Sequence, residues 1–362
     1  MGPIRRVRVN ASGAVSWRRL PGLAGDDRLL AVTAITTAIA AAWRLATVSL
    51  DTGAPTVPTT AIPEVSTAFA SRTGGVGAQR TVQIAISPGR RQVADAGGSR
   101  RRPARAASRA DDEVQRAIDR LLATEDRRVE FEAALGRMGA YAPFIRATLR
   151  ERGVPQELLY LAMIESAYKP GAVSPVGATG MWQFMRGTGA LYGLEVSAYV
   201  DERRDPVRST QAAVRHLDGL HREFGSWYLA LAAYNAGSPR VWRVLRRHAE
   251  GRAGNELVYW QIRPHLPSET RAYVPLFLAA AEIARRPSEY GLTPASSPPL
   301  SFREVWYPGG TPLGQIARSR GLSADKVLAL NPHLVRGVTP PGRAWPVRLP
   351  LASTVSQSTA SE

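Results

Sequence analysis

The sequence predicts a mostly α-helical protein, with a helical domain at residues 111–292 and a small α+β module at residues 301–350. Three observations support this fold class. Apolar residues recur at helical spacing through the first region, and strand-like alternation is not sustained there. Proline, glycine and capping residues mark the ends of the expected helices. The chain is 44% hydrophobic, which allows a sizeable core within its 362 residues.

The N-terminal third is expected to hold an export segment followed by a disordered tether. Residues 29–43 are uncharged and follow several arginines. Their length of 15 residues is below the ~20 that a spanning helix needs and within the ~7–15 of a signal peptide. Residues 1–43 are therefore interpreted as a cytoplasmic leading region with a signal or anchor. A core helix or an incorrectly assigned start is the alternative. Residues 44–110 are basic and aperiodic, which is typical of a disordered linker.

Composition excludes several classes of site. The chain has no cysteine, which excludes disulfides, thiolate metal sites and lipid attachment through an N-terminal cysteine. Its five histidines lack the spacing of a zinc-protease motif, so we expect neither a metal nor another cofactor. The net charge is +17, and the basic excess lies mainly in the N-terminal third. The arginine run at 100–102 lacks interleaved aromatic residues, so we expect no nucleic-acid partner.

The helices of the domain are placed by their start and stop signals. Acidic residues fill the first turn of the first helix, where they suit the helix dipole. Pro155 opens the second helix and Pro170 closes it. Asp205 caps the third, and glycine follows its end. The expected ranges are 111–123, 155–168, 206–222, 238–250 and 268–286.

The C-terminal region is expected to be a separately tethered module. Residues 293–300 are rich in proline and serine and predict a hinge. In residues 301–350, apolar residues flank a helical stretch, and proline and glycine crowd both ends. This pattern fits a short strand, one or two helices and a second short strand. Residues 351–362 are expected to be a polar tail.

One carboxylate stands out as a candidate general acid. Glu165 shares a helical stripe with apolar residues such as Leu158 and Leu161, which predicts partial desolvation. It also lies in the last turn of its helix, at the negative end of the dipole. Both effects favour a protonated acid near neutral pH, which glycoside chemistry requires. The alternative is a glutamate paired with an arginine at a helix end.

A glycine-rich segment follows this glutamate. Residues 171–189 contain five glycines and are interrupted by the run from Met181 to Phe184. Such a segment can bring backbone amides and aromatic faces close to a sugar. Tyr234 and Tyr273 follow further along the chain. Taken singly, each aromatic residue is more typical of a core position than of a ligand contact.

Five linked motifs carry a family resemblance between Val154 and Gly291. They are VPQELLYLAMIESAY, SPVGATGMWQFM, DERRDPVRSTQAA, WYLALAAYNAG and LPSETRAYVP, in family order and with family-like spacing. The chain thus resembles the bacterial membrane-bound lytic murein transglycosylases of the D type. The resemblance implies a goose-lysozyme-like catalytic domain in which Glu165 is the sole general acid and then the base. It also implies substrate-binding roles for Ser174, Met181, Gln183, Phe184, Tyr234, Asn235 and Tyr273.

The resemblance distributes these roles over one cleft. Polar positions lining the saccharide correspond to Ser174 and Gln183, and apolar positions of the wall correspond to Met181 and Phe184. The A-Y-N motif, which faces the N-acetyl group and the catalytic carboxylate, corresponds to Tyr234 and Asn235. The tyrosine that closes over the site corresponds to Tyr273.

The implied reaction is cleavage of peptidoglycan glycan strands between N-acetylmuramic acid and N-acetylglucosamine, leaving 1,6-anhydro-N-acetylmuramic ends. Two alternatives stay open. A hydrolytic muramidase on the same fold would need a second carboxylate, for which Asp201, Glu202 and Asp205 are the nearest acids downstream. A catalytically inactive glycan-binding scaffold is the other alternative.

The module at 301–350 resembles a degenerate LysM, a βααβ fold that binds glycans containing N-acetylglucosamine. Residues 311–332 match its helical core, and residues 339–350 match its closing turn and strand. The alternative is a structural cap on the catalytic domain. Family members usually carry an N-terminal lipoprotein cysteine, which this chain lacks. The expected location is therefore the periplasm or cell envelope, with residues 29–43 providing membrane association if uncleaved. The sequence does not indicate an oligomeric state.

Overall fold

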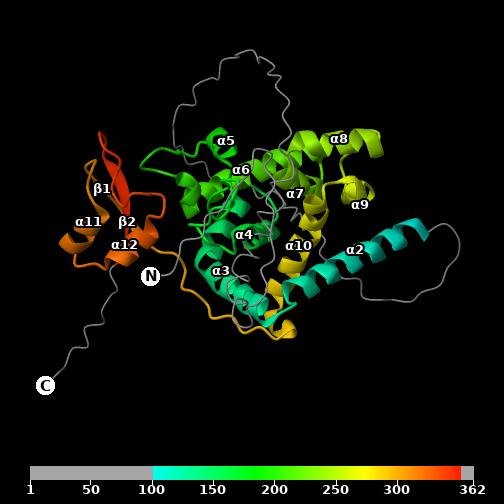
Figure 1. The fold of residues 1–362 in the computed structure, drawn as a ribbon, viewed down its shortest axis with the longest axis horizontal. Helices are drawn as coiled ribbons and strands as arrows, with labels where there is room; N and C mark the ends of the chain where they lie inside the picture. The colour runs from blue at the N-terminus through cyan, green and yellow to red at the C-terminus, as the bar shows by residue number, and fades with distance from the viewer. Residues whose placement is uncertain (1–100, 352–362) are drawn as a thin grey trace, which may run out of the picture. The chain divides into compact units, whose positions relative to one another are not determined.

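The computed structural model describes residues 101–351, and the mostly α-helical class is confirmed over this part (Figure 1). The expected signal or anchor at 29–43, most of the 44–110 linker and nearly all of the polar tail lie outside the described residues. The elements are α2 (Arg101–Leu121), α3 (Glu125–Glu151), α4 (Leu161–Ser166), α5 (Arg186–Leu191), α6 (Pro206–Phe224), α7 (Trp227–Ala236), α8 (Ser238–His248), α9 (Glu256–Ile262), α10 (Ser268–Arg285), β1 (Arg303–Tyr307), α11 (Leu313–Ser319), α12 (Ala324–Leu330) and β2 (Trp345–Leu349).

The core of the helical domain is built around α7. Residues 227–233 of this helix are all buried, and α6, α8, α9 and α10 pack against it (Figure 1). A helix that is apolar on every side is stable only inside a protein, so the composition of α7 fixes its central place. Ser226 begins the helix by accepting a hydrogen bond from the Leu229 amide at 3.2 Å. Tyr234 and Asn235 are thereby held near the end of a buried, rigid helix.

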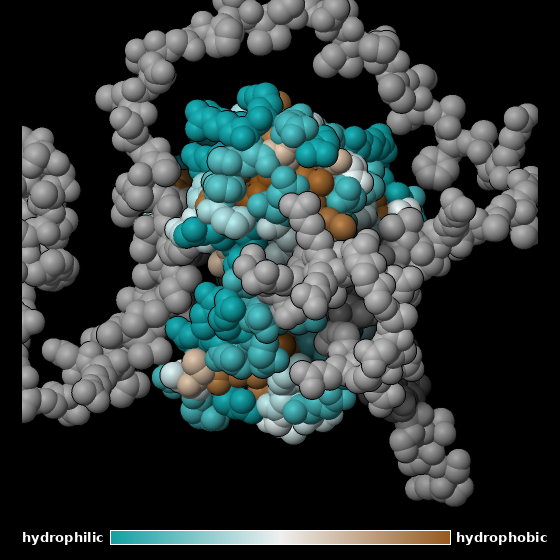
Figure 2. Space-filling model, turned by 90° about the vertical axis from the view of Figure 1, so that its right-hand side faces the viewer, coloured by the Kyte–Doolittle hydropathy of each residue, from teal (hydrophilic) through white to brown (hydrophobic). Residues whose placement is uncertain are grey.

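Helix α8 is amphipathic and covers one side of the domain. It buries Val241, Val244 and Leu245 against the core. Its outer side carries Arg243, Arg246 and other exposed polar residues. Figure 2 shows hydrophilic residues over the upper part of this side of the molecule, where α8 lies. The division follows from the 3.6-residue period of the helix.

Several predicted boundaries differ in the structure. Helix α2 begins at Arg101, inside the segment expected as a disordered linker. The single helix expected over 155–168 is a 3₁₀ turn at Gln156–Tyr160 followed by the short α4. Helix α4 ends earlier than expected because Ala167 adopts a left-handed conformation with φ 52°. The third helix begins at Pro206 after the Asp205 cap, as predicted, and runs to Phe224, two residues beyond the predicted end and just before left-handed Gly225.

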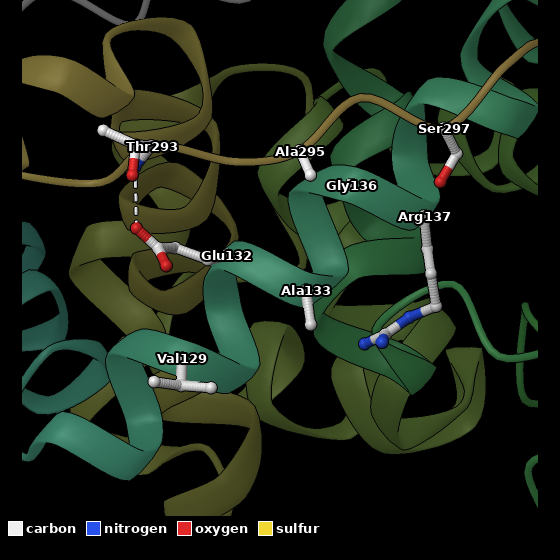
Figure 3. A pocket seen from close by; sticks show the side chains of 8 residues that line it. All are labelled: Val129, Glu132, Ala133, Gly136, Arg137, Thr293, Ala295 and Ser297. Carbon is white, nitrogen blue, oxygen red and sulfur yellow. Dashed lines mark hydrogen bonds between the residues drawn. The ribbon is translucent and has the colours of Figure 1, made fainter.

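The segment expected as a hinge is packed along α3. Its backbone amides at Ser297 and Leu300 donate to the carbonyls of Gly136 and Ala140 at 3.2 and 2.8 Å. The close approach depends on Gly136, where a Cβ would lie 2.6 Å from a carbonyl oxygen of the segment. Figure 3 shows the segment crossing α3 beside a pocket that both line. The pocket has a volume of about 350 Å³, and the Thr293 amide donates to Glu132 at 2.7 Å. These contacts contradict a free hinge.

The C-terminal module has the predicted strand–helix–helix–strand order. Strands β1 and β2 pair antiparallel, with Val305 opposite Val347. Helices α11 and α12 pack together, and α12 packs against β2. Asn331 joins α12 to β2, because its side-chain amide donates to Val327 and Arg348 carbonyls and its oxygen accepts the Arg348 amide. Within residues 101–351, none of the helices combines the length and hydropathy needed to cross a bilayer.

Candidate active site

Glu165 lies in the last turn of α4, partly buried, and its carboxylate is contacted by Tyr273 of α10. The Tyr273 hydroxyl donates a hydrogen bond to Glu165 Oε1. Burial and the neighbouring carboxylate raise the pKa of Tyr273 well above its usual value. The hydroxyl therefore keeps its proton and remains a donor at physiological pH. The structure brings together the two residues that the sequence analysis placed at the centre of the site.

The backbone after Glu165 is held in an unusual conformation. Ala167 and Tyr168 both have positive φ, at 52° and 58°, which non-glycine residues rarely adopt. Two contacts hold them: Tyr168 donates to the Leu159 carbonyl at 2.7 Å, and Arg137 Nε donates to the Ala167 carbonyl at 2.7 Å. Strained backbone of this kind persists only where its surroundings fix it. The backbone that directly follows Glu165 is therefore fixed by the fold.

The glycine-rich loop is tied directly to the end of α4. Ser166 Oγ donates to the Met181 carbonyl at 2.8 Å. Within the loop, the amide of Gly180 donates to the Ala172 carbonyl at 2.8 Å, and Thr179 and Phe184 exchange backbone hydrogen bonds. These contacts hold the segment from Met181 to Phe184 beside the catalytic candidate.

Two predicted polar contacts, Ser174 and Gln183, brace the loop itself. Ser174 Oγ accepts the Ala178 amide at 3.0 Å and is largely buried. Gln183 has a positive φ of 49°, and its Nε2 donates to the Gly180 carbonyl at 2.8 Å. Their side chains thus shape the loop, and Gln183 remains partly exposed.

Met181 and Phe184 differ from the expected cleft wall. Both side chains are buried, with relative exposures of 0% and 2%. Phe184 packs among aromatic rings that include Tyr234 and His216. Both residues therefore support the loop from behind in this structure. The apolar pattern of the segment reflects core packing, which is the commoner role of buried aromatic and methionine side chains.

Tyr234 connects the loop to the central helix. Its hydroxyl donates to the Trp182 carbonyl at 2.8 Å, and Trp182 Nε1 donates to Thr210 of α6 at 2.8 Å. Burial and the charge of Glu165 raise the pKa of Tyr234 well above its usual value. The Tyr234 hydroxyl therefore keeps its proton at physiological pH and remains a donor.

Asn235 is directed toward α10. Its Nδ2 donates to Glu269 Oε1 at 2.6 Å, and Thr270 Oγ1 donates to its Oδ1 at 2.9 Å. Glu269 also contributes to the raised pKa of Tyr273, one helical turn later. Glu269 was not among the site residues predicted from the sequence. Its four-residue spacing from Tyr273 was the signal that could have identified it.

The three acids of the DERRDP motif are each engaged elsewhere. Asp201 accepts two hydrogen bonds from the Arg203 guanidinium, at 2.9 and 2.8 Å. Glu202 accepts the Glu195 amide at 2.9 Å and the Arg208 guanidinium at 3.2 Å. Asp205 caps α6 by accepting the amides of two residues in its first turn. All three are buried, and all three are held by arginines or backbone amides, which indicates a structural role. In the described residues no group of three or more metal-ligating side chains occurs.

Arg203 is a site-supporting residue that the sequence analysis missed. Its guanidinium donates to the carbonyls of Gly177 and Phe184 at 2.9 and 3.2 Å, while Asp201 neutralises its charge. It therefore holds the backbone of the glycine-rich loop at two points, Gly177 and Phe184. The motif was visible in the sequence, but the contacts cross 19 and 26 residues and leave no local periodic signal.

Comparison with known proteins finds similarity within the helical domain. Residues 142–256 match the model of the Transglycosylase SLT domain. The chain is 33% identical over 193 residues to membrane-bound lytic murein transglycosylase D of Escherichia coli K12, covering 53% of this chain and 42% of that protein. It is 30% identical over 146 residues to the soluble lytic murein transglycosylase of the same strain, covering 39% of this chain and 22% of that protein.

A solved structure, the 70-kDa soluble lytic transglycosylase of Escherichia coli, is 28% identical with a TM-score of 0.35, covering 43% of this chain and 25% of that one. The chain spans less than half the length of each of these relatives.

Proposed function

We propose that this chain is a peptidoglycan lytic transglycosylase that uses Glu165 as its only acid and base. The observation that carries the proposal is the pairing of Glu165, which lies within the SLT-matched residues 142–256, with Tyr273 of α10. The relatives are named as lytic murein transglycosylases, which supports the same substrate class here. Their cell-wall substrate also supports a location in the cell envelope.

The proposed reaction needs one carboxyl group and no water. Protonated Glu165 donates to the glycosidic oxygen as the bond to the muramic C1 breaks, releasing the 4-hydroxyl of N-acetylglucosamine. The substrate's own N-acetyl group stabilises the oxocarbenium-like centre. The Glu165 carboxylate then accepts the proton of the muramic 6-hydroxyl, whose oxygen bonds to C1. Because the nucleophile belongs to the reacting sugar, the attack is intramolecular and strongly favoured.

The rival muramidase needs a second acid close to the reacting bond. Two-carboxylate glycosidases place their groups ~5–9.5 Å apart. Asp201, Glu202 and Asp205 are buried and bound to arginines or backbone amides, which argues against this role. Glu269 accepts a hydrogen bond from Asn235. In this proposal it orients that binding residue and does not serve as a second acid. Asn235 and the exposed part of Gln183 are the proposed contacts to the saccharide.

We also propose roles for residues 29–43 and for the C-terminal module. Residues 29–43 would export the chain to the periplasm or anchor it in the inner membrane. The module at 301–350 would contact glycan as a LysM-like fold. Each proposal extends the cell-envelope location and is separable from the catalytic assignment.

Replacing Tyr273 with phenylalanine is expected to reduce release of soluble fragments from purified peptidoglycan by roughly 10- to 100-fold. A hydrogen bond to a charged group contributes ~1.5–3 kcal/mol, and here it orients the reacting carboxylate. The matched control is Tyr228→Phe, because Tyr228 is also a buried tyrosine but packs against Tyr259 and Trp260. Equal activity of both variants would contradict a role for the Tyr273 hydroxyl, and a wild-type chain that releases no fragments would contradict the proposed function.

A further inference from the structure

The loop at residues 195–205 is shared between the helical domain and the C-terminal module. Val200 is fully buried in the core of the module, in one cluster with Leu313 and Leu334. Backbone bonds run in both directions, because the Asp201 amide donates to the His333 carbonyl at 2.9 Å and the Val335 amide donates to Tyr199 at 3.0 Å. A module that moved freely on a tether would expose this apolar side chain.

A buried ion pair lies at the same junction. Two nitrogens of Arg348 on β2 contact the two carboxylate oxygens of Asp205 at 2.9 and 2.8 Å. Asp205 is 2% exposed and Arg348 is 5% exposed. The arginine also contacts Glu304 at 3.2 Å and stacks over the Phe302 ring. Breaking one partner of such a pair leaves an uncompensated buried charge, which is strongly unfavourable.

Two series of contacts link this junction to the glycine-rich loop at residues 171–189. Asp201 orients Arg203, which holds the carbonyls of Gly177 and Phe184. Asp205 caps α6, and Thr210 in the next turn of that helix holds the Trp182 indole. Both aspartates therefore contact the module on one side and support the loop beside Glu165 on the other.

We propose that the C-terminal module is a positioning element of the active site, with Arg348 as its positioning residue. By neutralising Asp205 and enclosing Val200, the module fixes the 195–205 loop, and this loop fixes the segment from Gly177 to Phe184. The module is thus a required part of the catalytic scaffold, whatever glycan affinity it adds. The consequence for cleavage rests on the proposed function, whereas the consequence for loop order does not.

The test compares the full-length chain with Arg348→Met, which keeps the aliphatic volume and removes the charge. Amide hydrogen exchange is measured at Thr179, Gly180 and Phe184, whose amides are bonded within the loop. We expect exchange there to become at least tenfold faster, and kcat on short soluble glycan fragments to fall at least tenfold. The matched control is Arg343→Gln, which breaks an exposed ion pair to Glu195 at the same junction and is expected to match wild type.

Arg348→Lys keeps the charge without the two-point contact, so its exchange rates should lie between those of the wild type and the methionine variant. If circular dichroism shows that Arg348→Met does not fold, Arg348→Lys serves as the test variant. Unchanged exchange at the three amides, or faster exchange with unchanged cleavage, would overturn the proposal. The exchange measurement needs no substrate, so it decides the positioning role even if the cleavage assay refutes the proposed function.

Discussion

Replacing Glu165 with glutamine is expected to reduce glycan cleavage by about 10⁴-fold or more, because one group serves both proton transfers. The amide has nearly the same shape as the carboxyl group, and its oxygen can still accept the Tyr273 hydrogen bond. It cannot donate and recover a proton as the acid does. The rate is measured on purified peptidoglycan, with circular dichroism confirming that the variant is folded.

The control for this variant is Glu157→Gln, which lies on the turn preceding α4 and forms an ion pair with Arg285 at 2.7 Å. It changes a carboxylate of the same kind in the same region without touching Tyr273. We expect its cleavage rate to stay within about twofold of wild type, since partly exposed ion pairs contribute only ~0–1 kcal/mol. A Glu165→Gln variant that retained a tenth of wild-type activity would contradict the assignment.

Replacing Gly180 with alanine is expected to lower the free energy of unfolding by about 2–5 kcal/mol. Gly180 has φ of +86°, and a Cβ there would overlap the backbone oxygen of Arg203. The left-handed backbone costs a residue with a Cβ ~1–2 kcal/mol, and forcing atoms into a packed site costs a further ~1–3 kcal/mol. Because the clash pushes the loop away from Arg203, cleavage should fall with stability. Urea denaturation measures the change.

Gly177→Ala separates the cost of the left-handed backbone from the cost of the steric overlap. Gly177 has a similar φ of +81°, but a Cβ there would meet nothing within 4 Å. Its expected loss is therefore only about 1–2 kcal/mol, from the backbone alone. If both alanine variants lost the same amount, the contact between Gly180 and Arg203 would not constrain the loop.

The chemistry-bearing residues were predictable from the sequence because they lie in short motifs. Glu165 and Tyr273 come from motifs more than 100 residues apart, and the family order of those motifs indicated that they meet. The cap at Asp205 was readable from its neighbours alone, since Pro206 follows it directly. Local signals of this kind depend on a few consecutive residues.

The long-range contacts that hold the site in place could not be predicted in the same way. The contact of Arg348 with Asp205 spans 143 residues, and neither residue carries a periodic signal for it. The proline-rich segment at 293–300 predicted a hinge from composition, but Gly136 of α3 allows the segment to pack closely. The buried state of Met181 and Phe184 likewise depends on rings contributed by α6 and α7. Such features are set by tertiary contacts.

The most direct test of the single-carboxylate mechanism is digestion of purified peptidoglycan by the full-length chain in water enriched in oxygen-18. Mass analysis of the released muramic ends then identifies the nucleophile. Attack by the muramic 6-hydroxyl predicts unlabelled 1,6-anhydro ends, lighter by one water than reducing ends and resistant to borohydride. Mostly reducing ends carrying the label would show that water attacks, and would contradict the mechanism proposed for Glu165.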